Sequence, residues 1–385
     1  MDTLFFTGEH AMLVEMVRDF ADNEITPVAR ELDATGEFPK NLVHQMAELG
    51  LMGIPIPESL GGAGMDTVAY AATVMELARA DASVAITMAA HTSLATIPNV
   101  IAASEEQKKK FVPPLASGEM IGAFGLTEPD AGSDAGATKT TAVKKGDEYI
   151  LNGGKIFITN VGEAGILNLT ARVIEGDEDK GIGAFIIETN TPGLIINPKE
   201  KKMGWCASDT RQIFFEDMAV PAKNMLGTPG IGFKTFLKTL TGGRISIAAL
   251  SVGTALGAYE RALKYAAERK AFGKVIHKFQ AIGNKLADMA TEIEAAKLLT
   301  FHAAWMKDQG LDIQKEAAMA KLFASETAMR TTTEAIQIHG GYGYVKEYDV
   351  ERYFRDAKIL EIGEGTSEIQ RLIISKNIVN SVKAM

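Results

Sequence analysis

The chain has 385 residues, of which 46% are hydrophobic and 23% are charged, a balance typical of globular proteins that argues against disorder. Its length predicts roughly two or three domains. The formal net charge of −9 and the pI of about 5.4 exclude a global positive field, so we expect neither nucleic acid nor anionic lipid as a partner.

The amino-terminal residues 1–25 mix acidic and apolar side chains at helical spacing, unlike a signal peptide or an Arg-rich transit peptide. We find no apolar run of the roughly eighteen residues that a membrane span needs, and expect no span. The six histidines lack metal-ligand spacing, which predicts no metal site. The single cysteine, Cys206, cannot form an internal disulfide and is interpreted as a small, half-buried residue. Together these features favour a reducing, cytoplasmic location.

Three segments of different character follow one another. Apolar residues recur every three or four positions from about residue 8 to 118, which predicts helices. Short runs such as "YILNGGKIFITN" and "QIFFEDMAVP" then predict a small antiparallel β domain, and long helical patterns after it are typical of an antiparallel bundle. We therefore predict an α+β fold, mostly α: an N-terminal helical domain at 1–119, a middle β domain at 120–230 and a C-terminal four-helix-bundle domain at 231–385.

The stretch "KILEIGEGTSEIQRLIIS" near the C-terminal end places one carboxylate, Glu364, between two glycines. Glycines on both sides let the backbone approach a ligand closely. Ser367 and Gln370 have the spacing of a capping box, which predicts that a helix begins there. The stretch alone fits either a helix end, a turn and a new helix, or a catalytic carboxylate.

Five motifs occur in a fixed order along the chain: "GLTEPDAGSDAGA" at 125–137, "KIFITN", "ERKAFG" with a Gln eleven residues after its Arg, "QIHGGYGYVKEYDVERYFRD" at 337–356, and "EGTSEIQ". This series resembles the acyl-CoA dehydrogenase family over essentially the whole chain. The resemblance implies the three-part fold, FAD as cofactor, an acyl-CoA substrate of short, medium, branched or cyclic type, electron transfer to an electron-transferring flavoprotein, and a homotetramer built from the C-terminal helices.

The chemistry of thioester desaturation requires a base at the α carbon, hydrogen-bond donors for the developing enolate oxygen, and a hydride acceptor at the β carbon. Glu364 resembles the base of the family, and its own N–H resembles one of the donors. Some branches carry the base one residue before the arginine of a central helix, but that position is Gly243 here. This favours Glu364. Enclosure by apolar groups should raise the pKa of such a carboxylate.

The resemblance also implies a set of cofactor contacts. The residues are Phe124, Leu126, Thr127, Ser133, Phe157, Ile158, Thr159, Arg269, Phe272, Gln280, Gln337, Gly340, Gly341, Thr366 and Glu368. Of these, Arg269, Phe272 and Gln280 resemble the family residues that reach the FAD of a neighbouring subunit. Phe157 stands where the family usually has Trp, and a core β-strand is the competing interpretation of "KIFITN".

The implied substrate contacts are Ser133, Thr241, Arg244, Gly363 and Gly365. Thr241 replaces the frequent Asp of the family, which weakens the prediction of an acidic contact there. Gly363 replaces an aromatic residue, and the missing ring leaves volume beside the acyl chain. We therefore hypothesise tolerance for a bulkier, branched or cyclic acyl group.

Two alternatives to a dehydrogenase stay open at this stage: an oxidase of the same fold that passes electrons to oxygen, and a non-catalytic scaffold that binds CoA or flavin. Two histidines are also open. His91 is either a specificity residue or a core histidine, with the core favoured, and His339 is expected to be a surface or capping residue.

Overall fold

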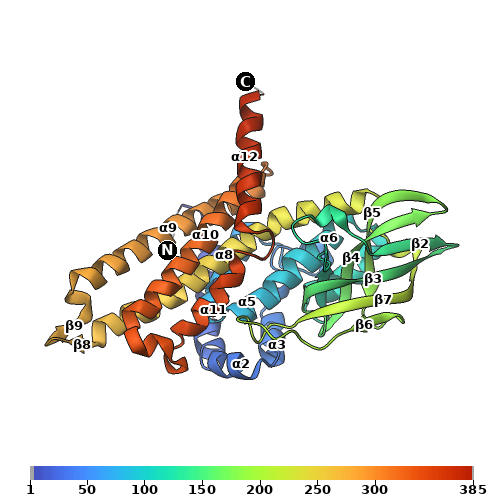
Figure 1. Ribbon diagram of the computed structural model, residues 1–385. Helices are drawn as coiled ribbons and strands as arrows, with labels where there is room; N and C mark the ends of the chain where they lie inside the picture. Colours follow the sequence, from blue (N-terminus) through green and yellow to red (C-terminus); the bar gives the residue numbers. More distant parts are fainter. Residues whose placement is uncertain (1–3, 384–385) are drawn as a thin grey trace.

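The computed structural model describes residues 4–383 and shows a helical part, a sheet and a second helical part in chain order (Figure 1). The N-terminal helices are α1 (Gly8–Phe20), α2 (Ala29–Thr35), α3 (Lys40–Glu48), α4 (Thr67–Ala80), α5 (Ala82–Ala89), η4 (Ala90–Thr96), α6 (Ile97–Ala102) and α7 (Glu105–Ala116). Local sequence sets where they begin. At α7, Ser104 Oγ accepts the Gln107 N–H at 3.2 Å and Gln107 Oε1 accepts the Ser104 N–H at 2.7 Å.

One helical stretch, Ala82–Ala102, is long and apolar enough to cross a membrane by length and composition, contrary to our expectation that no such run exists. Most of it is buried inside the structure, as in a core helix. His91 lies within it, buried, with Nε2 bonded to the Leu115 carbonyl at 2.9 Å and Nδ1 accepting the Gly122 N–H at 3.0 Å. His91 is therefore a satisfied core histidine, as the sequence favoured.

The middle part is one mixed sheet rather than the antiparallel sheet that we predicted. Among the described residues its strands are β1 (Ile121–Gly125), β2 (Thr141–Lys145), β3 (Glu148–Thr159), β4 (Ala164–Glu175), β5 (Glu178–Glu188), β6 (Leu194–Ile196) and β7 (Thr210–Pro221). Strand β4 pairs parallel with both β1 and β2, and antiparallel with β5. The residues between β1 and β4 act as a crossover connection, which parallel pairing requires and which strand composition does not reveal.

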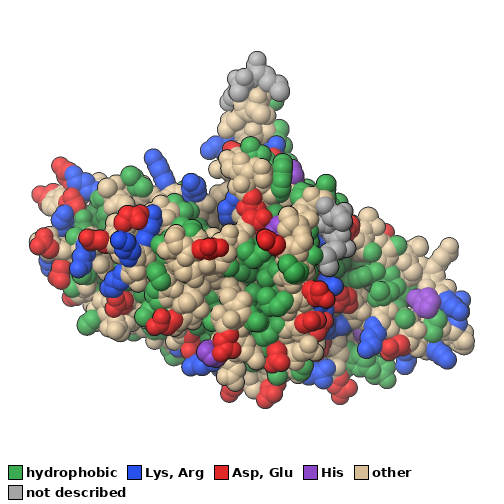
Figure 2. Space-filling model, turned by 180° about the vertical axis from the view of Figure 1, so that it is seen from behind, with side chains coloured by type: hydrophobic (Ala, Val, Ile, Leu, Met, Phe, Trp, Pro, Cys, Tyr) green, Lys and Arg blue, Asp and Glu red, His purple; other side chains and the backbone are tan. Residues whose placement is uncertain are grey.

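The C-terminal part is built on long helices: α8 (Ile231–Glu268), α9 (Gln280–Asp308), α10 (Gln314–His339), α11 (Val350–Leu360) and α12 (Ser367–Lys383). A small hairpin of β8 (Lys270–Ala271) and β9 (Lys274–Val275) joins α8 to α9 at one end of the molecule (Figure 1). Helix α12 stands out from the bundle. Figure 2 shows it from behind as a projecting column that carries hydrophobic as well as polar side chains.

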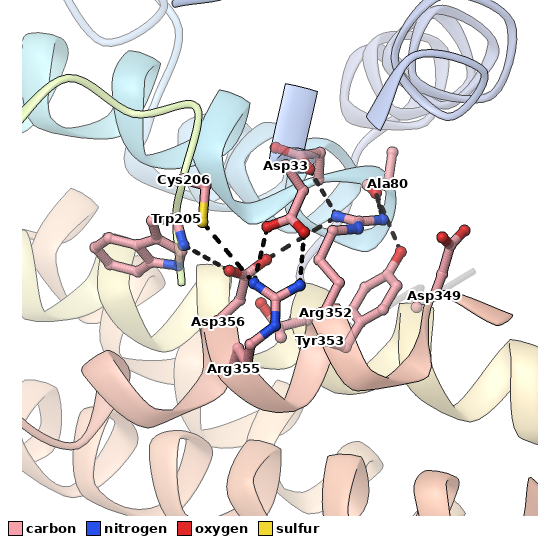
Figure 3. Close-up of polar contacts among 12 residues, drawn as sticks. Asp33, Ala80, Trp205, Cys206, Asp349, Arg352, Tyr353, Arg355 and Asp356 are labelled. Carbon is pink, nitrogen blue, oxygen red and sulfur yellow. Dashed lines mark hydrogen bonds and ion pairs between the residues drawn. The ribbon is translucent and has the colours of Figure 1, made fainter. Parts of the chain in front are cut away.

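Helix α11 ties the three parts together through buried charges (Figure 3). The Arg352 guanidinium lies 2.6 Å from the Asp81 carboxylate, and both side chains are almost fully buried. The Tyr353 hydroxyl donates to the carbonyl of Arg79 at 2.6 Å. These residues belong to the motif "VERYFRD", so part of that motif anchors α11 to the N-terminal helices.

A second set of contacts on α11 reaches α2 and the connection between β6 and β7 (Figure 3). Arg355 pairs with both oxygens of Asp33, at 2.9 and 2.6 Å. The buried Asp356 accepts the Trp205 N–H at 2.6 Å. Burial raises the pKa of the neighbouring Cys206 thiol to about 11, so this half-buried cysteine is not an activated thiol.

Candidate active site

The turn between α11 and α12 holds Glu364 in a conformation that few residues adopt. Its φ of 52° is in the left-handed region, and Gly365 follows with φ of 98°. The turn is closed by two backbone bonds, from Gly363 N–H to the Ile359 carbonyl at 2.8 Å and from Ser367 N–H to the Glu361 carbonyl at 2.9 Å. A strained non-glycine residue is held in place only by its surroundings, and such residues cluster at functional sites.

The new helix begins one residue earlier than the capping-box spacing predicted. Thr366, not Ser367, is the cap, because its Oγ1 accepts the Ile369 N–H at 3.3 Å. Gln370 does not complete a capping box either. Its Nε2 donates to the Gly365 carbonyl at 2.8 Å, so this side chain fixes the turn that carries Glu364.

The Glu364 carboxylate is poorly solvated. Its Oε2 is buried and has no hydrogen-bond partner among the described residues. Burial raises the pKa of Glu364 to about 7, and the charges of Lys321 and Arg244 oppose this rise. A carboxyl group with a pKa near neutrality suits proton abstraction at physiological pH.

Gly243 on α8 makes room for this carboxylate. A Cβ atom at that position would lie 2.3 Å from Glu364 Oε2 and 3.2 Å from Leu94 Cδ2. A side chain at residue 243 and the observed position of Glu364 are therefore incompatible, so the glycine that lacks the alternative base also leaves the space that the Glu364 carboxylate occupies.

A cleft of about 780 Å³ adjoins this site, between the N-terminal helices, α8 and the connection from α9 to α10. Thr241 and Gly242 line it next to Gly243, and Tyr70 and Ser93 line it from the N-terminal part. Arg244 lies at the same place on α8, largely buried, with an unpaired Nε. The structure thus brings Glu364, Gly363, Gly365, Thr366, Arg244 and Thr241 into one region.

Several polar groups around the turn lack partners. The backbone N–H groups of Glu364, Gly365 and Thr366 have no acceptor within residues 4–383. The Ser367 hydroxyl and Gln370 Oε1 are buried and unpaired as well. Because buried polar groups are nearly always hydrogen-bonded, this concentration of unpaired donors and acceptors fits a ligand with carbonyl or anionic oxygens.

The residues expected along the flavin ring lie on β1, β3 and the loop between β1 and β2. Phe124 stacks on Phe236 of α8, with ring centroids 4.2 Å apart. The Thr127 carbonyl accepts the Ile156 N–H at 2.9 Å, which joins the loop to β3. Leu126 is buried and its carbonyl accepts from Lys155, whereas Ser133 is exposed.

Strand β3 presents an aromatic face where its pairing with β7 is interrupted, between Lys155 and Ile158. Phe157, with φ of 59°, is 63% exposed there, while Ile158 is buried and Thr159 is half-buried. A large exposed aromatic side chain beside a bulge fits a planar ligand packed against it. The core β-strand interpretation of "KIFITN" is therefore confirmed for Ile158, while the flavin contact of the exposed Phe157 stays a prediction.

The remaining predicted cofactor residues form a separate group at the far end of α8. A second cleft of about 600 Å³ is lined there by Arg269, Gly340 and Gly341. Phe272 on the β8–β9 hairpin is 95% exposed, and Gln280 and Gln337 are exposed nearby in the chain. Arg269 follows Arg244 by 25 residues, about 38 Å along α8 at 1.5 Å per residue, so one dinucleotide cannot contact both groups within a single chain. Glu368 is exposed at the start of α12.

His339 ends α10 and bonds to a carbonyl of its last turn, as predicted for a capping residue, but it is not the surface residue that was the alternative. It is buried and stacks on Tyr265 at 4.2 Å, and its Nδ1 bonds to the Ala335 carbonyl at 2.8 Å. Burial lowers the pKa of its imidazole. The covering ring comes from α8, which the sequence around His339 could not indicate.

Sequence reasoning missed Lys321, a fully buried lysine on α10 whose charge acts on Glu364. A signal was present, because the residues one turn away on the same face are small. These are Ala317, Ala318, Ala324 and Ser325, all buried. No group of His, Cys, Asp and Glu suited to a metal ion occurs among the residues described.

Known proteins with similar sequences identify the family of this chain. Three family models match in chain order: the acyl-CoA dehydrogenase N-terminal domain at residues 7–119, the middle domain at 123–218 and the C-terminal domain at 230–379. A short-chain specific acyl-CoA dehydrogenase of Clostridium acetobutylicum is 48% identical over 97% of this chain and 98% of its own.

Two solved structures have nearly the same fold as this chain. Butyryl-CoA dehydrogenase from Megasphaera elsdenii has a TM-score of 0.95 at 44% identity, covering 98% of this chain and 100% of its own. A chain from a study of the electron transferring flavoprotein of Acidaminococcus fermentans has a TM-score of 0.95 at 46% identity, covering 98% and 99%. The protein therefore belongs to the acyl-CoA dehydrogenases, a family of FAD-dependent flavoprotein oxidoreductases, and is close to its short-chain and butyryl-CoA members.

Proposed function

We propose that the protein desaturates a short acyl-CoA thioester between its α and β carbons, with Glu364 as the base. The observation that supports this best is the Glu364 carboxylate itself, which is desolvated on a strained turn beside the 780 Å³ cleft with one oxygen unpaired. An unpaired oxygen is available to take up a proton, and a pKa near 7 lets the carboxylate do so at neutral pH.

The groups around the turn have different roles in proton removal. Glu364 takes the α-proton, and its own unpaired N–H donates to the thioester oxygen on which negative charge develops. Arg244 adds positive charge on the same side of the site. Bound FAD would supply the acceptor for the hydride that leaves the β carbon.

The residues present fit an FAD group. Phe157 offers an exposed aromatic face, and Leu126 and Thr127 lie in the loop beside it. The backbone N–H groups of residues 364–366 are unpaired and can donate to a ligand. The sequence-predicted contacts of Phe124, Ile158, Thr159, Ser133 and Glu368 remain part of this proposal, and Gln337 belongs with the separate group around Arg269.

We further propose that a second copy of the chain completes each cofactor site. Arg269, Phe272, Gln280, Gly340 and Gly341 are too far from the Glu364 region to serve the same cofactor in one chain. Helix α12 also projects from the bundle (Figure 2). Leu372 on this helix is 65% exposed. An uncovered apolar helix face fits contact between copies, in line with the homotetramer that the resemblance implies.

The acyl group, the electron acceptor and the location complete the proposal. The similarity to short-chain and butyryl-CoA relatives supports a short acyl group, while Gly363 leaves space, since a Cβ there would meet nothing closer than the Ile359 carbonyl at 3.5 Å. We keep the hypothesis that branched or cyclic groups are tolerated.

An electron-transferring flavoprotein as acceptor fits the matched chain of Acidaminococcus fermentans. A cytoplasmic location rests on the single cysteine.

The test is turnover of butyryl-, isobutyryl- and cyclohexanoyl-CoA with an artificial electron acceptor, run for wild type, Glu364→Gln and Glu361→Gln. The first variant should keep bound FAD and lose at least about a hundredfold in rate, because that is the usual contribution of a general base. The second removes a nearby carboxylate that pairs with Lys358 at 2.6 Å, and should keep its rate. Full activity of Glu364→Gln would refute the proposal, and rapid reoxidation of the reduced enzyme by air would indicate an oxidase instead.

A further inference from the structure

Lys321 lies in the middle of α10 with a side chain that solvent does not reach. Its Nζ donates to the Gly365 carbonyl at 2.8 Å, and that carbonyl belongs to the residue directly after Glu364. Gln370 Nε2 donates to the same oxygen, also at 2.8 Å. One carbonyl of the strained turn is therefore held by two side chains, one charged and one neutral.

The Lys321 ammonium has no carboxylate within ion-pair distance among residues 4–383, although it is fully buried. Lys155, which is equally buried, shows the usual arrangement, because Glu128 lies 2.7 Å from its Nζ. A buried charge is unfavourable unless other charges compensate it. For Lys321 the largest compensating charge is Glu364, and for Glu364 the largest is Lys321.

We propose that Lys321 is a positioning residue for the Glu364 base: its ammonium fixes the turn through the Gly365 carbonyl, and its positive charge stabilises the Glu364 carboxylate. This inference rests on the proposed function of Glu364. It assigns Lys321 an electrostatic role that its neutral neighbour Gln370 cannot share, although both side chains bind the same oxygen.

The titratable groups around this pair come from four further segments, and Tyr70 among them is neutral because burial raises its pKa. They are Tyr70 on α4, Arg244 on α8, Glu361 after α11 and Glu368 on α12. Of these, only Arg244 supports the Glu364 carboxylate. Burial lowers the pKa of Lys321 to about 8 and raises that of Glu364 to about 7. As the pH rises, the Glu364 carboxyl group therefore loses its proton before the Lys321 ammonium does.

The experiment compares Lys321→Met with Gln370→Met. Each removes one hydrogen bond to the Gly365 carbonyl, but only the first removes a charge. We measure kcat/KM for butyryl-CoA against pH, and titrate the Glu364 carboxyl by infrared difference spectroscopy with Glu364→Gln as the blank. Lys321→Met should move the acidic limb of the profile, and the infrared titration, upward by about one pH unit or more. Gln370→Met should lower the thermal midpoint and leave both titrations in place.

The outcomes separate this inference from the proposed function. If Glu364→Gln keeps full turnover, the proposed function fails, but the infrared titration of Glu364 still tests Lys321. If Glu364→Gln is inactive and Lys321→Met titrates like wild type, the inference about Lys321 is wrong. Should Lys321→Met not fold, Lys321→Gln replaces it: an upward shift supports the electrostatic role, and an unshifted titration overturns it because the amide keeps a donor without the charge.

Discussion

Replacing Gly243 by alanine places a methyl group where the Glu364 carboxylate lies. The Cβ position is 2.3 Å from Oε2, whereas real Cβ contacts are essentially never under 3.0 Å, so the oxygen must retreat by at least about 0.7 Å. A misplacement of about 1 Å at a reacting group costs on the order of a hundredfold in rate. We therefore expect kcat of Gly243→Ala to fall by about ten- to a hundredfold.

The neighbouring glycine supplies a matched control. At Gly242 a Cβ would meet only the far end of the Lys307 side chain, at 3.4 Å. Both glycines are inside α8, where alanine is favoured over glycine by about 0.5–1 kcal/mol. Gly242→Ala should therefore be slightly more stable than wild type and keep its turnover.

The assay is steady-state turnover of butyryl-CoA with an artificial acceptor, together with bound-FAD absorbance and the thermal midpoint of each variant. A loss of rate in Gly243→Ala with FAD and midpoint retained would locate the defect at the carboxylate. If Gly243→Ala instead turns over within twofold of wild type, either Glu364 is not the base or its carboxylate does not occupy the position against α8.

Three other predictions concern the rest of the molecule. Burial raises the pKa of Asp356 to about 7 from an unfolded value near 3.8, so between these two pH values the folded state binds a proton that the unfolded state does not. The free energy of unfolding should therefore fall as the pH rises from about 4 to about 7. Asp356→Asn should flatten this pH dependence, measured by urea titration at each pH. Asp81→Asn removes the carboxylate that lies 2.6 Å from the buried Arg352 and leaves only that of Asp356 at 4.0 Å, which should cost about 3–5 kcal/mol. A loss below about 1 kcal/mol would show that the pair is not buried as described. Ser104→Ala removes the cap of α7, far from Glu364 in the chain, and should lower stability by about 1 kcal/mol with turnover unchanged.

Local patterns predicted much of the fold and part of the site. Helical periodicity and β-rich runs marked the three parts in order, and the flanking glycines correctly indicated a turn at Glu364 before a helix. The direction of strand pairing was wrong, because parallel pairing of β4 with β1 and β2 depends on connections and not on strand composition. The burial of His339 was missed for a similar reason, since Tyr265, which covers it, is distant in sequence.

The base strength of Glu364 depends on residues that no local motif contains. A hydrogen-bond donor at Oε2 would stabilise the ionised form and lower the pKa, which would make a weaker base. The structure instead leaves Oε2 unpaired against Gly243, a position with no side chain that could donate. Burial alone would then favour the neutral acid too strongly, and the charge of Lys321 offsets it from the opposite helix. The three residues lie on α8, α10 and the α11–α12 turn, so packing of the bundle sets the pKa of the proposed base.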